Sequence, residues 1–269
     1  MSRKPKKENP FYKNKTTLTV YLVLRGLVIF VLIRSLLRRE YQSMFLCALS
    51  LVLMVLPSII SKKLKIVLPS TLEIIILLFI FAAEILGEIH SFYVRIPNWD
   101  TMLHTINGFL CAAIGFCLVD MLNRNDQFSF KLSPLYLAIV SFCFSMTVGV
   151  LWEFFECTMD RFFFLDMQKD AIVNTISTVM LDPTGGNSPQ IIRGITDVIV
   201  VTDHGEIPLG LGGYLDIGLL DTMKDLFVNF IGAVVFSIVG YFYVKSRGQG
   251  KFAKNFIPQV REEKDDPAE

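Results

Sequence analysis

Acidic and imidazole side chains occur in short groups at the ends of strongly apolar segments. The three main groups are Asp100 with His104, Glu153 with Glu156, and Asp221 with Lys224, Asp225 and Asn229. Ionisable side chains are costly inside a bilayer, and those found there usually serve a function. Carboxylates and imidazole can bind a divalent metal ion or act as general acid and base. The groups therefore predict one polar site, provided that helices bring them together.

The spacing within each group favours a helix that presents its members on one face. Asp100 and His104 are four residues apart, and Glu153 and Glu156 are three apart. Side chains at these spacings lie on one side of a helix, as the ligands of carboxylate metal sites in helix bundles do. We expect metal ligands at His104, Glu153, Glu156 and Asp225, and acid–base groups at these four and Asp100. The expected supporting residues are Glu84, Glu88, Asp170, Asn174, Asp221, Lys224 and Asn229.

Each group also has a purely structural interpretation. Asp100 follows Trp99 and could cap a helix, while a single histidine such as His104 is more often a hydrogen-bonded structural residue. Glu153 and Glu156 could end a helix at the membrane interface beside Trp152. Together, at one depth in the membrane, the groups favour a site.

Composition places the chain in a bilayer. Of its 269 residues, 52% are hydrophobic and 19% are charged, whereas an ordinary soluble domain is about 25% charged. The mean hydropathy is +0.51. A basic tail over residues 1–16 precedes an apolar segment, so it indicates a cytoplasmic anchor and not a nucleic-acid-binding arm. The five cysteines form no CxxC zinc pattern.

Six segments are long and apolar enough to span a bilayer as helices. They are residues 17–37, 42–61, 68–91, 101–121, 133–156 and 221–244. We expect an all-α polytopic bundle, with helices one to five in residues 17–156, an extracytoplasmic α/β insert at 157–220, a sixth helix at 221–244 and a charged cytoplasmic tail at 245–269.

Lys and Arg alone set the expected orientation. The positive-inside rule puts both termini and the Lys62–Lys63 loop in the cytoplasm of a cell-membrane protein. The short loop with Arg34, Arg38 and Arg39 disagrees with this orientation. The acidic groups then all fall at the outer ends of their helices, although they took no part in the assignment.

The insert is too long for a simple loop. An amphipathic stretch from Met167 to Leu181 predicts a helix, and Asp203-His204-Gly205 predicts the turn of a hairpin. An Asp-Asp-Asn pattern with four-residue spacing also occurs twice, first at Asp166, Asp170 and Asn174 and again at Asp221, Asp225 and Asn229. Both copies are expected to start a helix with these residues on one face, either through shared function or because acids suit helix starts.

Three motifs resemble a known family. They are Trp99-Asp100-xxx-His104, Leu151-Trp152-Glu153-Phe154-Phe155-Glu156 and Gln168-Lys169-Asp170-xxx-Asn174, and they are similar to the YjdF-like bacterial inner-membrane proteins. Asp225-xxx-Asn229-xx-Gly232 resembles a helix start of VanZ-like proteins, which are linked to glycopeptide resistance. The resemblance covers about residues 70–245 and implies a bacterial cytoplasmic membrane. Here the Asp-Asp-Asn pattern occurs twice, so either copy can match the family's motif.

These observations predict an outward-facing acidic and histidine site that binds a divalent metal and acts on, or binds, a cell-envelope molecule such as a lipid-linked precursor. One alternative is a transporter or proton-coupled carrier, although few polar residues lie in the inner halves of the spans beyond Arg25 and Glu73. A structural scaffold is the other alternative.

Overall fold

The computed structural model describes residues 15–63, 66–124, 132–246, 253–257 and 259–260. The chain forms two compact units. We call Met1–Gly149 together with Val228–Glu269 the helical unit, and Val150–Phe227 the insert unit. Two long helices, α7 (Pro134–Phe163) and α8 (Leu219–Lys245), pass from one unit into the other without a break.

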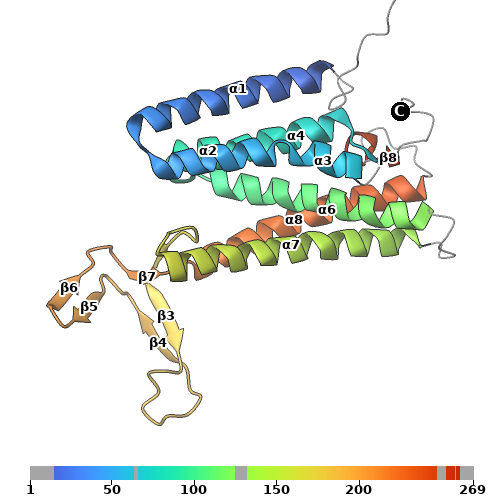
Figure 1. The fold of residues 1–269 in the computed structure, drawn as a ribbon. Helices are drawn as coiled ribbons and strands as arrows, with labels where there is room; N and C mark the ends of the chain where they lie inside the picture. The colour runs from blue at the N-terminus through green and yellow to red at the C-terminus, as the bar shows by residue number, and fades with distance from the viewer. Residues whose placement is uncertain (1–14, 64–65, 125–131, 247–252, 258, 261–269) are drawn as a thin grey trace, which may run out of the picture. The chain divides into compact units, whose positions relative to one another are not determined.

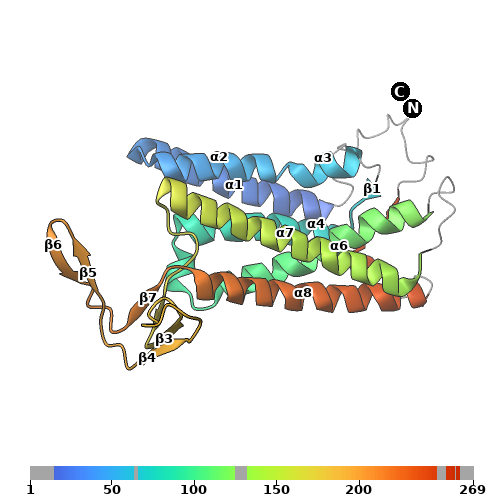
Figure 2. The ribbon, with the colours of Figure 1, turned by 90° about the horizontal axis from the view of Figure 1, so that it is seen from below.

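The helical unit contains helices whose axes run side by side (Figures 1 and 2). Besides parts of α7 and α8, these are α1 (Lys15–Arg38), α2 (Tyr41–Leu53), α3 (Leu56–Lys63), α4 (Ser70–Ile80), the π-helix η1 (Phe81–Ile89), the short α5 (Phe92–Arg95) and α6 (Trp99–Arg124). A strand pair joins β1 (Ile66–Val67) to β8 (Gln259–Val260), next to the 3-10 helix η2 (Ala253–Asn255).

Five stretches of the described chain are helical, long and apolar enough to cross a membrane. They are Lys15–Arg38, Tyr41–Lys63, Trp99–Asp120, Pro134–Phe163 and Leu219–Lys245. The expected third span at 68–91 is divided between α4 and η1, which have 11 and 9 residues and follow one another directly. The chain is therefore a largely helical, multi-pass membrane protein.

Two apolar clusters hold the helical unit together. One joins α4, α6, α7 and α8 around the buried Phe116 and Phe236, whose rings meet edge to face at 6.0 Å. The other joins α1, α2, α4 and η1 around Val28, Met54 and Leu77. The outer faces of these helices expose large apolar side chains, as a lipid environment allows and water does not.

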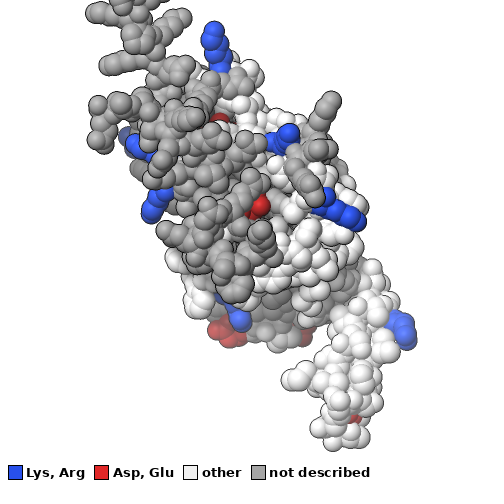
Figure 3. All heavy atoms as spheres, turned by 90° about the vertical axis from the view of Figure 1, so that its right-hand side faces the viewer, with Lys and Arg blue, Asp and Glu red and all other residues white. Residues whose placement is uncertain are grey.

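One end of the helical unit carries basic side chains. Lys15 begins α1, Lys62 and Lys63 end α3, and Lys245 ends α8, and these ends point the same way in the ribbon. Figure 3 looks onto this end, where blue side chains are distributed around the described surface. The hairpin between α1 and α2, with Arg38 and Arg39, lies at the opposite end together with the start of α6.

The insert unit is built from strands between its two helix ends. The strands are β2 (Ala171–Val173), β3 (Thr175–Thr178), β4 (Gln190–Arg193), β5 (Ile199–Thr202), β6 (Gly205–Pro208) and β7 (Tyr214–Asp216). They form three antiparallel pairs, β2 with β7, β3 with β4 and β5 with β6. The predicted hairpin turn is confirmed, because Thr202 pairs with Gly205 across it.

The helix predicted from Met167 to Leu181 is wrong, so the insert is not α/β. This stretch forms β2 and β3, in which Ile172, Val173 and Ile176 have the β-branched side chains that favour strands. Pairing with β7 and β4 supplies main-chain partners that the local pattern did not reveal. The first Asp-Asp-Asn copy is consequently not helical, and only the second copy, in α8, places its residues on one helical face.

Candidate functional site

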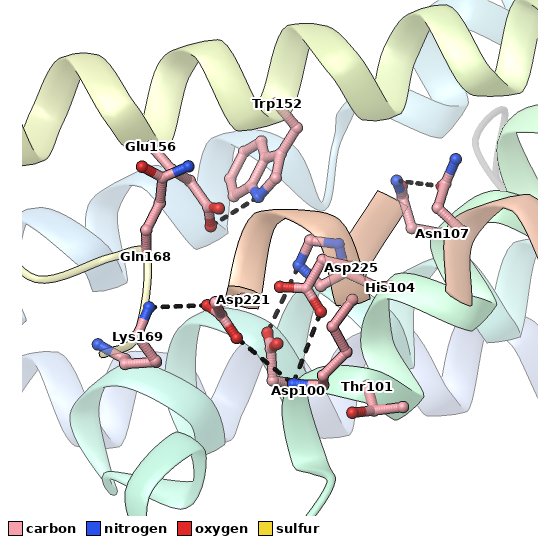
Figure 4. A network of polar contacts seen from close by, with 12 residues as sticks. Asp100, Thr101, His104, Asn107, Trp152, Glu156, Gln168, Lys169, Asp221 and Asp225 are labelled. Atoms are coloured by element: carbon pink, nitrogen blue, oxygen red, sulfur yellow. Dashed lines mark hydrogen bonds and ion pairs between the residues drawn. The ribbon is translucent and has the colours of Figure 1, made fainter. Parts of the chain in front are cut away.

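The helical unit contributes Asp100 and His104 from the first turns of α6. His104 Nε2 lies 3.4 Å from Asp100 Oδ1, and the two side chains are 11% and 21% exposed (Figure 4). Helix α6 begins at Trp99, so Asp100 lies inside the first turn and does not cap it. An acid at this position suits the positive end of the helix dipole. A carboxylate on one ring nitrogen also fixes the orientation of an imidazole.

Asn229 of α8 is buried where three helices meet. Its side-chain oxygen accepts a 3.5 Å hydrogen bond from Asn107 Nδ2 of α6 (Figure 4). Its own Nδ2 donates to the main-chain oxygen of Ser145 on α7 at 3.5 Å. Glycines permit this approach: a Cβ at Gly108 of α6 would lie 2.1 Å from Asn229 O, and one at Gly149 of α7 would lie 2.7 Å from Asn229 Nδ2. The two glycines therefore allow close packing of the three helices.

The insert unit contributes the two glutamates at the end of α7. Glu153 and Glu156 are 4% and 7% exposed, which is unusual for carboxylates. The indole of Trp152 donates a 2.8 Å hydrogen bond to Glu156 Oε1 (Figure 4). Trp152 is therefore more than an interfacial residue, because it orients the carboxylate.

After α7 the chain turns back as a short strap, residues 164–169. Asp160 fixes the strap by accepting hydrogen bonds from the main-chain N–H groups of Met167 and Gln168, at 2.7 and 2.9 Å. Gln168 Nε2 then donates to Thr222 Oγ1 at 2.6 Å and lies 3.4 Å from Glu153 Oε2. The strap thus joins the end of α7 to the start of α8 inside the insert unit.

The start of α8 adds a cation between two acids. Lys224 Nζ lies 3.4 Å from Asp221 Oδ1 and 3.8 Å from Asp225 Oδ1, so it is a counter-ion to both acids. Asp225 is 2% exposed. Asp221 Oδ2 also accepts a 2.7 Å hydrogen bond from the main chain of Lys169 in the strap (Figure 4).

Some of the expected supporting residues have other surroundings. Asn174 donates hydrogen bonds to the main-chain oxygens of Ile195 and Gly212, so it braces the strands of the insert. Asp170 is exposed, and desolvation together with the nearby acids Asp166 and Asp216 raises its pKa. Glu84 is half-buried and Glu88 exposed in the π-helix η1.

Three polar residues near the candidate groups were not predicted from sequence. Asp160 and Thr222 belong to no motif. The hydrogen-bond partners of Asp160 are main-chain groups, and the partner of Thr222 is distant in sequence. Gln168 stands in one of the family-like motifs, which was the available signal. Asp120 was also missed: it lies within α6 and is only 8% exposed.

Comparison with known proteins gives a family but no described activity. A family model described as "Predicted membrane protein (DUF2238)" matches residues 20–246. This match is consistent with the YjdF-like resemblance and gives no support to the VanZ-like one. No curated protein and no solved structure matches the chain.

Proposed function

Since the chain belongs to this family of predicted membrane proteins, we propose that it is a metal-dependent protein of the bacterial cell membrane that acts on, or binds, a cell-envelope molecule. The proposed ligands are His104, Glu153, Glu156 and Asp225. Asp100 would orient His104 and add acid–base capacity. Lipid-linked precursors are the substrate class that fits an acidic metal site at the outer membrane surface.

The observation that carries the proposal is the meeting of three helices at Asn229. Gly108, Gly149 and Asn229 lie against one another within the helical unit. His104 precedes Gly108 by four residues, Glu153 follows Gly149 by four, and Asp225 precedes Asn229 by four. Each helix continues unbroken through these positions. One turn advances a helix by about 5.4 Å and returns to the same face, which favours convergence of the three side chains.

The chemistry of the donors supports a divalent ion. The helical unit offers Asp100 and His104 as donors, and the insert unit offers the buried carboxylates Glu153, Glu156 and Asp225. Buried carboxylates are stabilised by positive charge, which a divalent ion would supply beside Lys224, whose Nζ lies 3.8 Å from Asp225 Oδ1. A mixture of carboxylates with one imidazole suits Mn²⁺, Fe²⁺ or Zn²⁺. Trp152 and Gln168 would hold the glutamates in place, as outer partners of metal ligands do.

The proposed topology has six spans, with α4 and η1 together forming the third. Their 11 and 9 residues make a helical run of 20, and about 20 residues cross a hydrocarbon core. The basic end of the helical unit supports a cytoplasmic position for both termini. Asp100 and His104 would then lie near the outer surface.

Metal content tests this function directly. Wild-type protein purified in detergent is expected to retain close to one transition-metal ion per chain, measured by elemental mass spectrometry. His104→Ala and Glu153→Ala should each lose it while keeping the elution volume and helical circular dichroism of the wild type. His204→Ala and Glu206→Ala are the matched controls, since both residues lie at the β5–β6 turn and His204 is 91% exposed. Equal metal content in all five proteins would refute the metal site.

A proton-coupled carrier is the second candidate, and buried Asp120 favours it. Asp120 lies 16 residues after His104 on α6, about 24 Å further along the helix axis. Asp120 ends the candidate span Trp99–Asp120, so the two ionisable groups stand at opposite ends of one span, as groups of a proton relay do. Acidification of proteoliposomes that is lost in Asp120→Asn would support the carrier, and metal-dependent activity retained in that variant would favour the first candidate.

A further inference from the structure

After its last long helix the chain packs again onto the basic end of the helical unit. The turn η2 is followed by β8, which pairs antiparallel with β1 in the connection between α3 and α4 (Figure 1). We call residues 253–257 together with β8 the C-terminal segment. Its Ala253, Phe256 and Ile257 side chains are 4%, 9% and 2% exposed, whereas Lys254 and Asn255 face outward. One face of this segment is therefore buried in the bundle.

Phe256 belongs to a chain of aromatic rings that runs into the bundle. Its ring meets Phe109 of α6 edge to face at 5.0 Å, and Phe109 meets Phe236 of α8 in the same way at 5.1 Å. Leu72, in the first turn of α4, is fully buried in the same apolar cluster. The C-terminal segment thus packs where α4, α6 and α8 meet. Phe109 is five residues from His104, about 7.5 Å along the axis of α6.

The attachment of the C-terminal segment is slight for its length. β8 and β1 pair over two residues each, and an isolated pair of strands is marginally stable in water. Ordering the eight residues 253–260 also costs conformational entropy at least as large as the gain from burying the Phe256 and Ile257 side chains. These opposing contributions favour an attachment that is reversible and that can be broken without unfolding a long helix.

We propose that the C-terminal segment is a gate at the basic end of the helical unit. When it is seated, Phe256 and Ile257 close the space beside Phe109 to water. When it leaves, water and small ions enter as far as Phe109 and so approach the polar start of α6 from the basic end. The gate contains none of the proposed metal ligands, so it does not depend on the metal site. In a carrier it would control access from this end.

Cysteine labelling of the purified full-length protein measures the gate. Leu72→Cys and Leu77→Cys each place one probe on α4. Both leucines are fully buried, but Leu77 belongs to the apolar cluster that lacks the C-terminal segment. A charged thiol reagent should label both probes slowly, and peptide mass spectrometry distinguishes them from the native cysteines. Phe256→Ala should speed labelling of Leu72→Cys by about 100-fold or more, the effect of losing a core phenylalanine, and leave Leu77→Cys unchanged.

A cross-link tests the gate with Phe256 in place. Val67 lies opposite Gln259 in the β1–β8 register, so Val67→Cys with Gln259→Cys can form a disulfide across the pair. The oxidised protein should label at Leu72→Cys more slowly than the matched protein with Val67→Ser and Gln259→Ser, because the disulfide prevents release. Equal rates in these two proteins would overturn the gate. So would a Phe256→Ala change that speeds labelling of both α4 probes alike, or of neither.

Discussion

Gly108 of α6 lies directly against the main chain of Asn229 on α8. A Cβ at Gly108 would lie 2.1 Å from the carbonyl oxygen of Asn229, closer than any real contact permits. Neither backbone can yield without moving a whole helix. Gly108→Ala should therefore lower the free energy of unfolding by about 1–3 kcal/mol, as overpacking does. Thermal unfolding in detergent measures this change.

The control for this substitution is Gly26→Ala. Gly26 is an exposed glycine of α1 with nothing within 4 Å of the position of a Cβ. Alanine there should leave stability equal or raise it by about 0.5–1 kcal/mol, because alanine has the higher helix propensity. If both variants melted alike, the close contact at Asn229 would not be important for stability.

Asp160 is predicted to control metal affinity without touching the metal. Its two oxygens hold the N–H groups of Met167 and Gln168 and so position Gln168 beside Glu153. Asp160→Ala should weaken metal binding by about 10–100-fold, the usual effect of removing an outer partner. Isothermal titration with Mn²⁺ or Zn²⁺ gives the affinity, and Asp160→Asn, which keeps one acceptor oxygen, should fall between wild type and Asp160→Ala.

Asp203→Asn provides the matched control for Asp160, since Asp203 is 86% exposed in the β5–β6 turn. Its metal affinity should equal that of wild type. An Asp160→Ala protein that binds metal as tightly as wild type would show that the strap has no influence on the ligands.

Asn174 should be important for the stability of the insert and unimportant for metal binding at the candidate site. Its carboxamide ties Ile195 O and Gly212 O together, at 2.7 and 2.9 Å. Asn174→Ala should speed amide hydrogen exchange in β2, β3 and β7 and lower local stability by about 1–3 kcal/mol. Metal content should stay at the wild-type value, in contrast to Asp225→Ala. Loss of metal in Asn174→Ala would instead assign function to the first Asp-Asp-Asn copy.

The loop after β3 should be sensitive to acid through Asp182. Hydrogen bonds from the main chain of Thr184 and Ser188 hold the pKa of Asp182 below its ordinary value. A carboxyl whose pKa is lower in the folded state stabilises that state above the unfolded pKa of about 3.9. This contribution disappears as the pH falls through the folded pKa. Hydrogen exchange at Thr184 and Ser188 should therefore be slower in wild type than in Asp182→Asn at neutral pH, and the two rates should become equal in acid.

Hydrophobic length predicted most of the helical unit. The apolar segments appear as α1, α2 with α3, α6, α7 and α8, because crossing a bilayer requires every main-chain polar group to be bonded within its own helix. The change from α-helix to π-helix at Phe81 was not predictable. In a π-helix each N–H bonds to the carbonyl five residues earlier, and this difference does not alter the hydrophobicity of the sequence.

The insert was harder to predict for a different physical reason. Residues 171–178 carry β-branched side chains whose partners lie at 190–193 and 214–216, and such non-local pairing overrides a local helical pattern. In the candidate site, the acids and His104 were visible as ionisable groups in apolar sequence. Asp160 and Gln168 were not, because their roles depend on hydrogen bonds to the main chain of a turn.

The strap is held to the insert unit by bonds of very different strength. Its main chain is fixed by Asp160 and Asp221 at 2.7–2.9 Å, whereas only the amide of Gln168, at 3.4 Å, reaches Glu153. Rotation about the Gln168 side-chain bonds therefore breaks the contacts of its amide with Glu153 and Thr222 and leaves every main-chain bond intact. Side-chain rotation takes picoseconds to nanoseconds, while loop opening takes far longer. The rotamer of Gln168 therefore decides whether its amide lies beside Glu153. When the amide turns away, a small solute reaches this carboxylate while the strap stays folded.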